Sequence, residues 1–330
     1  MMGKVYFVGA GSGDPELLTL KGKRVLEAAD VIIYDRLVHP VLLYLAKDSA
    51  RFIYSGKYPK NHVLKQKTIN ELLLEEGRKQ QCVVRLKGGD PGIFGRVGEE
   101  ITTLKSENIS YEIVPGVTAA SAASSYSGIP LTHRECSSKV TLATAHRQAG
   151  EMVDFKGLTE NGTVCLYMGV ERAKSTQKKL LEQGVSKDLP VAIIEWASLG
   201  RQRTVTTTLQ ELIKTIDDKH IQNPSLIILG EVAAYRKGAD WFEEMPLFGH
   251  KILLIDTQKI KFETILSYTQ EGADVYAIQV GEARDRRYDE VHQQYLKDHS
   301  FDEVVYLDQE LKTIYNKQWD VLKKEITLGK

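Results

Sequence analysis

The chain has 330 residues with 44 basic and 44 acidic side chains, so its formal net charge is zero and it creates no overall field that would attract nucleic acid. Its composition, 42% hydrophobic and 27% charged, is ordinary for a soluble globular protein, and no apolar run approaches the ~20 residues that a membrane span needs. The sequence enters a strand without the regions of a signal peptide, and its three cysteines have no Cys-x-x-Cys spacing, so we expect a cytoplasmic chain of two or three domains with reduced thiols.

Short apolar runs alternate with stretches of helical periodicity throughout the chain, beginning with residues 4 to 114, which predicts α/β layers and a largely parallel sheet. The expected strands cover residues 4–8, 31–34, 51–54, 82–86 and 111–114. The expected helices lie between them, at residues 16–29, 40–46, 64–79 and 97–107. Pro115-Gly116 then interrupts the pattern, and we place the end of a first α/β domain, residues 1–115, at this break.

A second α/β domain is expected over residues 116–240. It opens with a helix of small residues, 119–127, which Thr118 can cap. The run of threonines between Arg201 and Thr208 indicates an antiparallel hairpin strand rather than another crossover. Strands are predicted near residues 139–144, 163–168, 190–196, 203–207 and 225–229.

A third, small α/β lobe is expected over residues 247–330, after a break that contains Pro246. Three β/α units fit into this length, which makes a thin lobe. The predicted strands are residues 251–255, 274–278 and 303–307, and the predicted helices lie near residues 259–271, 286–297 and 313–326.

The segment Val84–Arg96 carries the clearest sign of a ligand site, because an apolar strand runs directly into a loop rich in glycine. Glycine has no side chain and tolerates positive φ, so its main chain can approach a ligand closely. In α/β proteins, ligands bind beyond the carboxyl ends of the strands. Asp35 and Lys57 also follow strand ends, and parallel strands would bring both to the same edge of the sheet. We therefore expect a small-molecule site at this edge.

Other ligand classes fit the sequence less well. A Gly-x-Gly-x-x-Gly dinucleotide fingerprint that starts at Gly9 would need glycine where Asp14 stands, and one that starts at Gly11 would need glycine where Glu16 stands. An acid in this loop would also repel a pyrophosphate. No His-x-His, His-Glu-x-x-His or Cys-His spacing indicates a metal site. A dinucleotide-dependent oxidoreductase remains as an alternative that binding of NAD would reveal.

Taken together, several segments resemble the tetrapyrrole (corrin/porphyrin) methylases, and among them the uroporphyrinogen-III C-methyltransferases. The segments occur in the order of the family over about residues 3–240, and their combination is far more specific than any single glycine loop. They are Val5–Gly22, Ala29–Val38, Val84–Arg96, Val114–Ser121, Gly128–Arg134, Tyr167–Gly169 and Leu229–Val232.

The resemblance implies a two-domain methylase fold with S-adenosyl-L-methionine in the cleft between the domains, S-adenosyl-L-homocysteine as the spent cofactor, and a homodimer. It also implies two successive ring methylations of uroporphyrinogen III, giving precorrin-2 for sirohaem or cobalamin synthesis. Two alternatives stay open. One is a methylase of the same fold that acts on a later precorrin or another acceptor, and the other is a non-catalytic scaffold that binds tetrapyrrole.

Carried over position by position, the resemblance also implies roles for single residues. Asp35 would accept a proton, and Lys57 would donate one. The substrate's carboxylates would meet Arg96, Glu99 and Arg134, a local cluster that suits a chain without net charge. No metal is needed, because the sulfonium is already activated. The cofactor would be bound by Ser12, Gly88, Gly89, Asp90, Ile93, Thr118, Ala119, Met168 and Ala197.

Two of these cofactor positions depart from the pattern of the family. Ser12 stands where proline is usual and Ala197 where glycine is usual, so we expect the affinity for the cofactor to differ while activity is kept. Residues 247–330 resemble the first lobe of uroporphyrinogen-III synthase, an enzyme that needs two lobes. We therefore expect a truncated lobe without synthase activity, which stabilises the methylase or docks onto it or onto a partner of the pathway.

Overall fold

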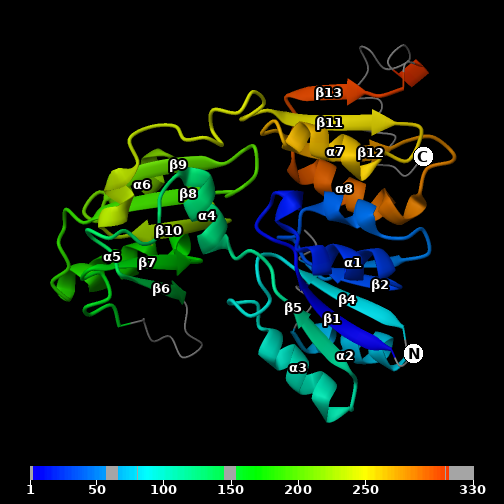
Figure 1. The fold of residues 1–330 in the computed structure, drawn as a ribbon, viewed down its shortest axis with the longest axis horizontal. Coiled ribbons are helices and arrows are strands. Elements are labelled where there is room, and N and C mark those ends of the chain that lie inside the picture. Colours follow the sequence, from blue (N-terminus) through cyan, green and yellow to red (C-terminus); the bar gives the residue numbers. More distant parts are fainter. Residues whose placement is uncertain (1–2, 57–65, 80, 145–153, 309, 312–330) are drawn as a thin grey trace. The chain divides into compact units, whose positions relative to one another are not determined.

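The computed structural model describes residues 3–56, 66–79, 81–144, 154–308, 310 and 311. The chain forms two compact units, of which the first is Met1–Val117 together with Pro246–Lys330 and the second is Thr118–Met245 (Figure 1). The chain leaves the first unit after Val117 and returns to it at Pro246. The segment from Pro246 onwards, here called the tail, therefore lies in the same unit as the N-terminal residues.

The first unit contains a five-stranded sheet in the order β3-β2-β4-β1-β5, and all its strands are parallel. This order brings the carboxyl ends of β4, β1 and β5 side by side at one edge. The strands are β1 (Lys4–Gly9), β2 (Val31–Tyr34), β3 (Arg51–Tyr54), β4 (Cys82–Lys87) and β5 (Tyr111–Val114). The helices are α1 (Leu20–Ala28), α2 (Gln66–Arg78) and α3 (Val97–Ser106), with the 3-10 helices η1 (Pro15–Leu17) and η2 (Pro40–Leu45).

Both faces of this sheet are buried, which explains why its strands are continuous apolar runs. Side chains alternate between the faces along each strand. Phe7 and Ile33 pack with residues of α2 and α3 on one face. Val8 and Ile32 pack with residues of α1 and η2 on the other face. The predicted parallel α/β arrangement of the first 115 residues is thus confirmed.

The second unit contains a five-stranded sheet in the order β6-β7-β10-β8-β9. Only β6 and β7 are parallel in this sheet, while β10 pairs antiparallel with both β7 and β8, and β9 pairs antiparallel with β8. The expectation of a largely parallel sheet is therefore wrong for this unit, although the hairpin strand after Arg201 is confirmed. The strands are β6 (Lys139–Thr144), β7 (Gly162–Tyr167), β8 (Pro190–Glu195), β9 (Arg203–Thr208) and β10 (Ser225–Leu229).

Helices cover both faces of the second sheet. Leu180 of α5 and Leu212 of α6 lie in the core of one face. Ala120 and Ala123 of α4 lie in the core of the other face, where their small side chains let the helix pack closely. The helices are α4 (Ala119–Ser127), α5 (Ala173–Glu182) and α6 (Leu212–Asp218), with the 3-10 helices η3 (Val170–Arg172) and η4 (Glu231–Tyr235).

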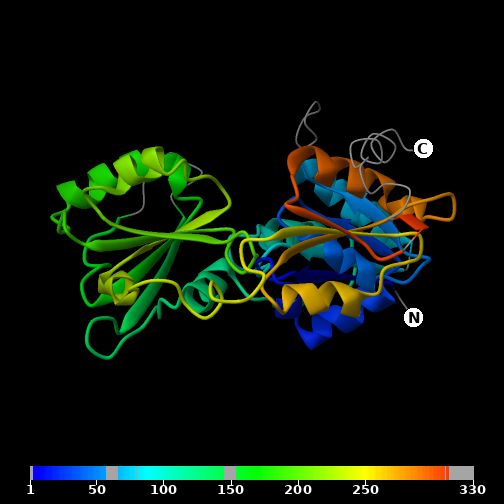
Figure 2. The same ribbon diagram turned by 90° about the horizontal axis from the view of Figure 1, so that it is seen from above.

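The tail has a parallel sheet of its own, in the order β12-β11-β13. Its core is nevertheless continuous with that of the N-terminal sheet, because Leu42 and Leu43 of η2 lie in one buried cluster with Ile255 and Ala277 of the tail. Figure 2 shows the tail, in yellow to red, against the blue N-terminal part of the chain. The elements are β11 (Lys251–Asp256), α7 (Phe262–Thr269), β12 (Asp274–Gln279), η5 (Arg286–Tyr288), α8 (Asp289–Asp298) and β13 (Glu303–Tyr306).

The core of the tail contains a buried imidazole. His292 of α8 is 3% exposed, and its Nδ1 lies 2.9 Å from the hydroxyl of Tyr276, which is also buried. Burial penalises the charged imidazolium and lowers the pKa of His292 to about 3. The folded tail therefore holds this histidine neutral. The predicted helix over residues 313–326 lies outside the described residues.

We expect the stability of the tail to fall on acidification. The unfolded chain takes up a proton on His292 near its ordinary pKa of about 6.5, whereas the folded chain resists protonation down to about 3. The contribution of His292 to stability is therefore complete above about pH 6.5 and declines at lower pH by about 1.4 kcal/mol per pH unit. Amide hydrogen exchange of β12, measured between about pH 4 and pH 7, reads this slope.

The variant His292→Gln should show a shallower dependence of β12 stability on pH. The matched control is His250→Gln, which changes an exposed imidazole in the same tail. Equal slopes for the wild-type chain and His292→Gln would show that the buried imidazole is not the titrating group.

Candidate functional site

Three strand ends of the first sheet meet closely because each carries glycine. A Cβ atom on Gly9, at the end of β1, would lie 2.6 Å from the Cα of Gly116, which follows β5. A Cβ atom on Gly116 would lie 2.3 Å from the carbonyl oxygen of Gly89, which follows β4. Real Cβ atoms do not approach backbone atoms so closely. Only glycine at positions 9 and 116 lets the three main chains converge.

Hydrogen bonds fix these glycine loops to one another. Gly11 N donates to Gly89 O over 3.3 Å, and Gly89 N donates to Gly11 O over 2.6 Å. Both glycines have positive φ, 76° and 67°. The carboxylate of Asp90 accepts from Gly92 N at 2.7 Å and from Gly116 N at 2.9 Å. Asp90 thus holds the loop after β4 against the loop after β5. Its implied contact with the cofactor stays a prediction.

Asp35 lies at the end of β2, in the same row of strand ends. Its Oδ1 accepts from Leu37 N at 3.1 Å, and its Oδ2 lies 3.4 Å from Nη2 of Arg85. The carboxylate keeps 29% of its surface exposed, so a ligand can reach it. A Cβ atom on Gly88 would lie only 2.8 Å from the Cβ of Leu37, which places the turn after Asp35 directly against the loop after β4.

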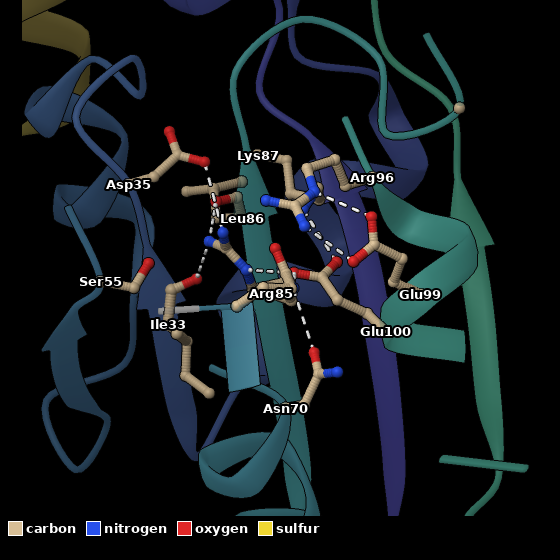
Figure 3. Close-up of polar contacts among 12 residues, drawn as sticks. Ile33, Asp35, Ser55, Asn70, Arg85, Leu86, Lys87, Arg96, Glu99 and Glu100 are labelled. Carbon is tan, nitrogen blue, oxygen red and sulfur yellow. Dashed lines mark hydrogen bonds and ion pairs between the residues drawn. The ribbon is translucent and has the colours of Figure 1, made fainter. Parts of the chain in front are cut away.

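A buried ionic network lies beneath these strand ends (Figure 3). Glu100 of α3 is fully buried and accepts from Nζ of Lys87 at 2.8 Å and from Nε of Arg85 at 3.3 Å. Burial, and after it the nearby Arg85, lowers the pKa of Lys87. These three residues are not among those predicted from the sequence to form the site. The sequence does contain an indication of this network. Arg85 and Lys87 stand at alternate positions of an otherwise apolar strand, so their side chains share one face of the sheet and need a buried anion.

Arg96 and Glu99, two of the residues expected to meet the substrate, pair with each other. Arg96 donates from Nε to Glu99 Oε1 at 2.9 Å and from Nη2 to Oε2 at 2.8 Å. Both are exposed, with 54% and 47% of their side-chain surface open. Arg96 and Phe94 adopt positive φ although neither is glycine. Strained backbone of this kind is typical of functional sites.

In the second unit, Tyr167 ties the start of α4 to the end of β7. Its hydroxyl lies 2.7 Å from Oγ1 of Thr118 and accepts from Ala120 N at 3.0 Å. The next residue, Met168, has φ of 53° and is 45% exposed, so it is not a core methionine. Tyr167 thus joins the helix start that carries Thr118 and Ala119 to the strand that Met168 follows. Sequence reasoning missed the role of Tyr167.

A second strained turn follows β8. Trp196 and Ser198, on either side of Ala197, have φ of 51° and 67°. The guanidinium of Arg201 lies 3.9 Å from the centroid of the Trp196 ring and covers one of its faces. Residues other than glycine thus adopt a left-handed backbone conformation after β7, at Met168, and after β8, on both sides of Ala197.

The remaining expected residues have simpler surroundings. Ser12 and Ile93 are half-buried in their loops, and Arg134 is exposed. Lys57, the expected proton donor, lies outside the described residues. Among the residues that the structure describes, no group of three or more His, Cys, Asp or Glu could hold a metal ion. No helix in that part of the chain is long and apolar enough to cross a membrane.

Known proteins that are similar to this chain in sequence and in structure indicate one family. The sequence model of the Tetrapyrrole (Corrin/Porphyrin) Methylases matches residues 4–213. The uroporphyrinogen-III C-methyltransferase of Priestia megaterium is 46% identical over 237 residues, which are 71% of this chain and 100% of that protein. A protein of the same name from Bacillus subtilis (strain 168) is 45% identical over 257 residues, 77% of this chain but 53% of its own length, so the chain spans about half of that relative.

A solved structure is also similar. It is the uroporphyrin-III C-methyl transferase of Thermus thermophilus in complex with S-adenyl homocysteine. The two structures have a TM-score of 0.62 and 40% sequence identity, over 70% of this chain and 99% of that one.

The convergence of the glycine loops can be tested with two alanine variants. We expect Gly116→Ala to lower the free energy of unfolding of the first unit by roughly 1–3 kcal/mol, because the new methyl group meets the carbonyl of Gly89. The matched control is Gly98→Ala in α3, where an added Cβ meets nothing within 4 Å. Urea unfolding measures both. If the two variants are equally stable, the strand ends do not pack as closely as described.

Proposed function

The chain belongs to the tetrapyrrole (corrin/porphyrin) methylases, and from this premise we propose that it methylates uroporphyrinogen III twice with S-adenosyl-L-methionine, giving precorrin-2 and S-adenosyl-L-homocysteine. The observation that carries the proposal is the set of converging glycine loops beside a partly exposed carboxylate, Asp35. The names of the similar proteins, and the S-adenyl homocysteine in the similar structure, support the same reaction.

The residues of the first unit fit such a cofactor. Gly88, Gly89 and the loops that Asp90 holds present bare main chain, which can donate and accept hydrogen bonds at close range. Ser12 and Ile93 lie in the adjoining loops and would complete this part of the contact. When bound, S-adenosylmethionine supplies a methyl group that its sulfonium has already activated, so the chain has to bind, orient and manage a proton.

In the second unit, the expected cofactor residues lie at a helix start and at two strand ends. Thr118 and Ala119 start α4, and Tyr167 holds this helix start against the end of β7. The exposed side chain of Met168 and the turn at Ala197 lie at strand ends with left-handed backbone, where strain is retained only if the surroundings enforce it. We assign these residues to cofactor binding.

Asp35 is the group that takes up the proton. Methylation of a pyrrole carbon leaves an electron-poor ring, which must lose a proton to recover, and a carboxylate near the ring can accept it. Leu37 N and Arg85 orient the carboxylate while leaving part of it open. Lys57, expected to donate a proton, would follow the end of β3, the neighbour of β2 in the sheet.

The substrate's carboxylates are received by cations at the surface. Arg96 is exposed, and Glu99 fixes the plane of its guanidinium in a two-point ion pair. Arg134 is an exposed cation of the second unit. Precorrin-2 from this reaction would serve sirohaem or cobalamin synthesis, and we propose that the chain works as a cytoplasmic homodimer.

The reaction is tested by incubating the chain with methyl-labelled S-adenosylmethionine and uroporphyrinogen III. We expect doubly methylated product, and we expect Asp35→Asn to lower kcat by roughly 100-fold or more, because it removes the general base. Binding of S-adenosylhomocysteine, measured by calorimetry, should be unchanged in this variant.

The matched control is Asp188→Asn, which changes an exposed acid of the second unit. Absence of methylated product from the wild-type chain would contradict the proposed reaction. Wild-type turnover in Asp35→Asn would contradict only the role given to Asp35.

A further inference from the structure

The connection between β2 and β3 starts at Asp35 and runs through η2 to Arg51. Its first residues touch the candidate site, because Leu37 N donates to the carboxylate of Asp35 and Leu37 lies against Gly88. Val38 N also donates to Asp35 O, over 3.2 Å. A short, hydrogen-bonded turn therefore links Asp35 to the later part of this connection.

The tail holds η2 through two buried tyrosines. The hydroxyl of Tyr44, on η2, donates to Ala277 O of β12 over 2.8 Å. In the opposite direction, the hydroxyl of Tyr288, in the tail, donates to Leu43 O over 2.8 Å. The two rings pack against each other with centroids 4.9 Å apart. Both hydroxyls lie in a buried environment, where a hydrogen bond left unmade is costly.

The tail also holds the end of the connection, just before β3. Arg287 donates from Nη1 to Lys47 O over 3.0 Å and to Ala50 O over 2.7 Å. Asp285 accepts from Arg287 and keeps its guanidinium in place. Lys259 of the tail forms an ion pair with Asp48.

A further contact lies at the start of η2. Nε2 of the buried His39 is 3.6 Å from Oδ1 of Asp274, the first residue of β12. Contacts from the tail thus reach η2 at its start and within it, and also reach the residues just before β3. None of these tail residues lies in the row of strand ends that carries Asp35 and the glycine loops.

We propose that the tail is a positioning element for methyl transfer: by clamping residues 39–50 it fixes the turn at Asp35 against the loop after β4. The proposal rests on the proposed role of Asp35 in catalysis. It gives residues 246–311 a task in the reaction that needs neither a second lobe nor any chemistry in the tail itself. Tyr44, Tyr288 and Arg287 act through Asp35 and are positioning residues.

The experiment uses the full chain with the double variant Tyr44→Phe/Tyr288→Phe, which keeps both rings and removes both hydroxyls. The matched control is Tyr276→Phe. It removes an equally buried tyrosine hydroxyl whose partner, His292, belongs to the tail. Both changes remove buried tyrosine hydroxyls that contact the tail, but only the first releases η2.

The first readout is amide hydrogen exchange over residues 31–38, which needs neither substrate nor activity. We expect at least tenfold faster exchange in the double variant and wild-type exchange in Tyr276→Phe. Unchanged exchange in the double variant, or the same acceleration in the control, overturns the proposal. If the wild-type chain makes no methylated product, the proposed function fails, while this readout still decides whether the tail fixes the turn.

The second readout is steady-state methyl transfer. We expect kcat to fall roughly tenfold in the double variant with the KM for S-adenosylmethionine unchanged, since displacement of a catalytic group affects the chemical step. Arg287→Lys is a second variant. It keeps the positive charge but loses the guanidinium group that donates to the carbonyls of Lys47 and Ala50. We expect the same fall in kcat with an unchanged KM. A rise in KM with unchanged kcat in both variants contradicts positioning of Asp35.

Discussion

The site depends on the close approach of three main chains at the carboxyl ends of β4, β1 and β5. Gly9 and Gly116 leave no room for side chains where these ends meet the main chain of Gly89, and Asp90 locks two of the loops by accepting from backbone amides. Because the strands are parallel and adjacent, the loops leave the sheet at one edge. The bare backbone at this edge, and the turn at Asp35 beside it, follow from that geometry.

The buried network beneath the site shows how the fold accommodates charged side chains near the strand ends. Two charged side chains of β4, Arg85 and Lys87, point to the same face and share the carboxylate of Glu100. Removing such charges from water is costly, and the compensating anion with its hydrogen bonds offsets much of that penalty. Arg85 also reaches Asp35, so the network joins the core of the first unit to the carboxylate that we assign to proton transfer.

Sequence reasoning succeeded where local pattern decides the outcome. The strands of the first sheet, the glycine loops and the hairpin strand β9 follow from apolar runs, breaks and threonine-rich stretches. It failed where distant segments decide. The insertion of β10 between β7 and β8 makes the second sheet mainly antiparallel, and periodicity carries no information on strand order. The bond from Tyr167 to the start of α4 and the core that the tail shares with η2 likewise depend on contacts between segments far apart in the chain.

The shared core has a consequence for how this gene can change. Leu42, Leu43 and Tyr44 are almost completely buried, and their cluster includes side chains from the tail. A truncated variant that ended near residue 245 would expose the apolar side chains of η2 to solvent, which favours aggregation. Loss of the last segment would therefore persist only together with polar replacements along η2. Substitutions in the two stretches are therefore expected to affect each other, although the stretches lie far apart along the chain.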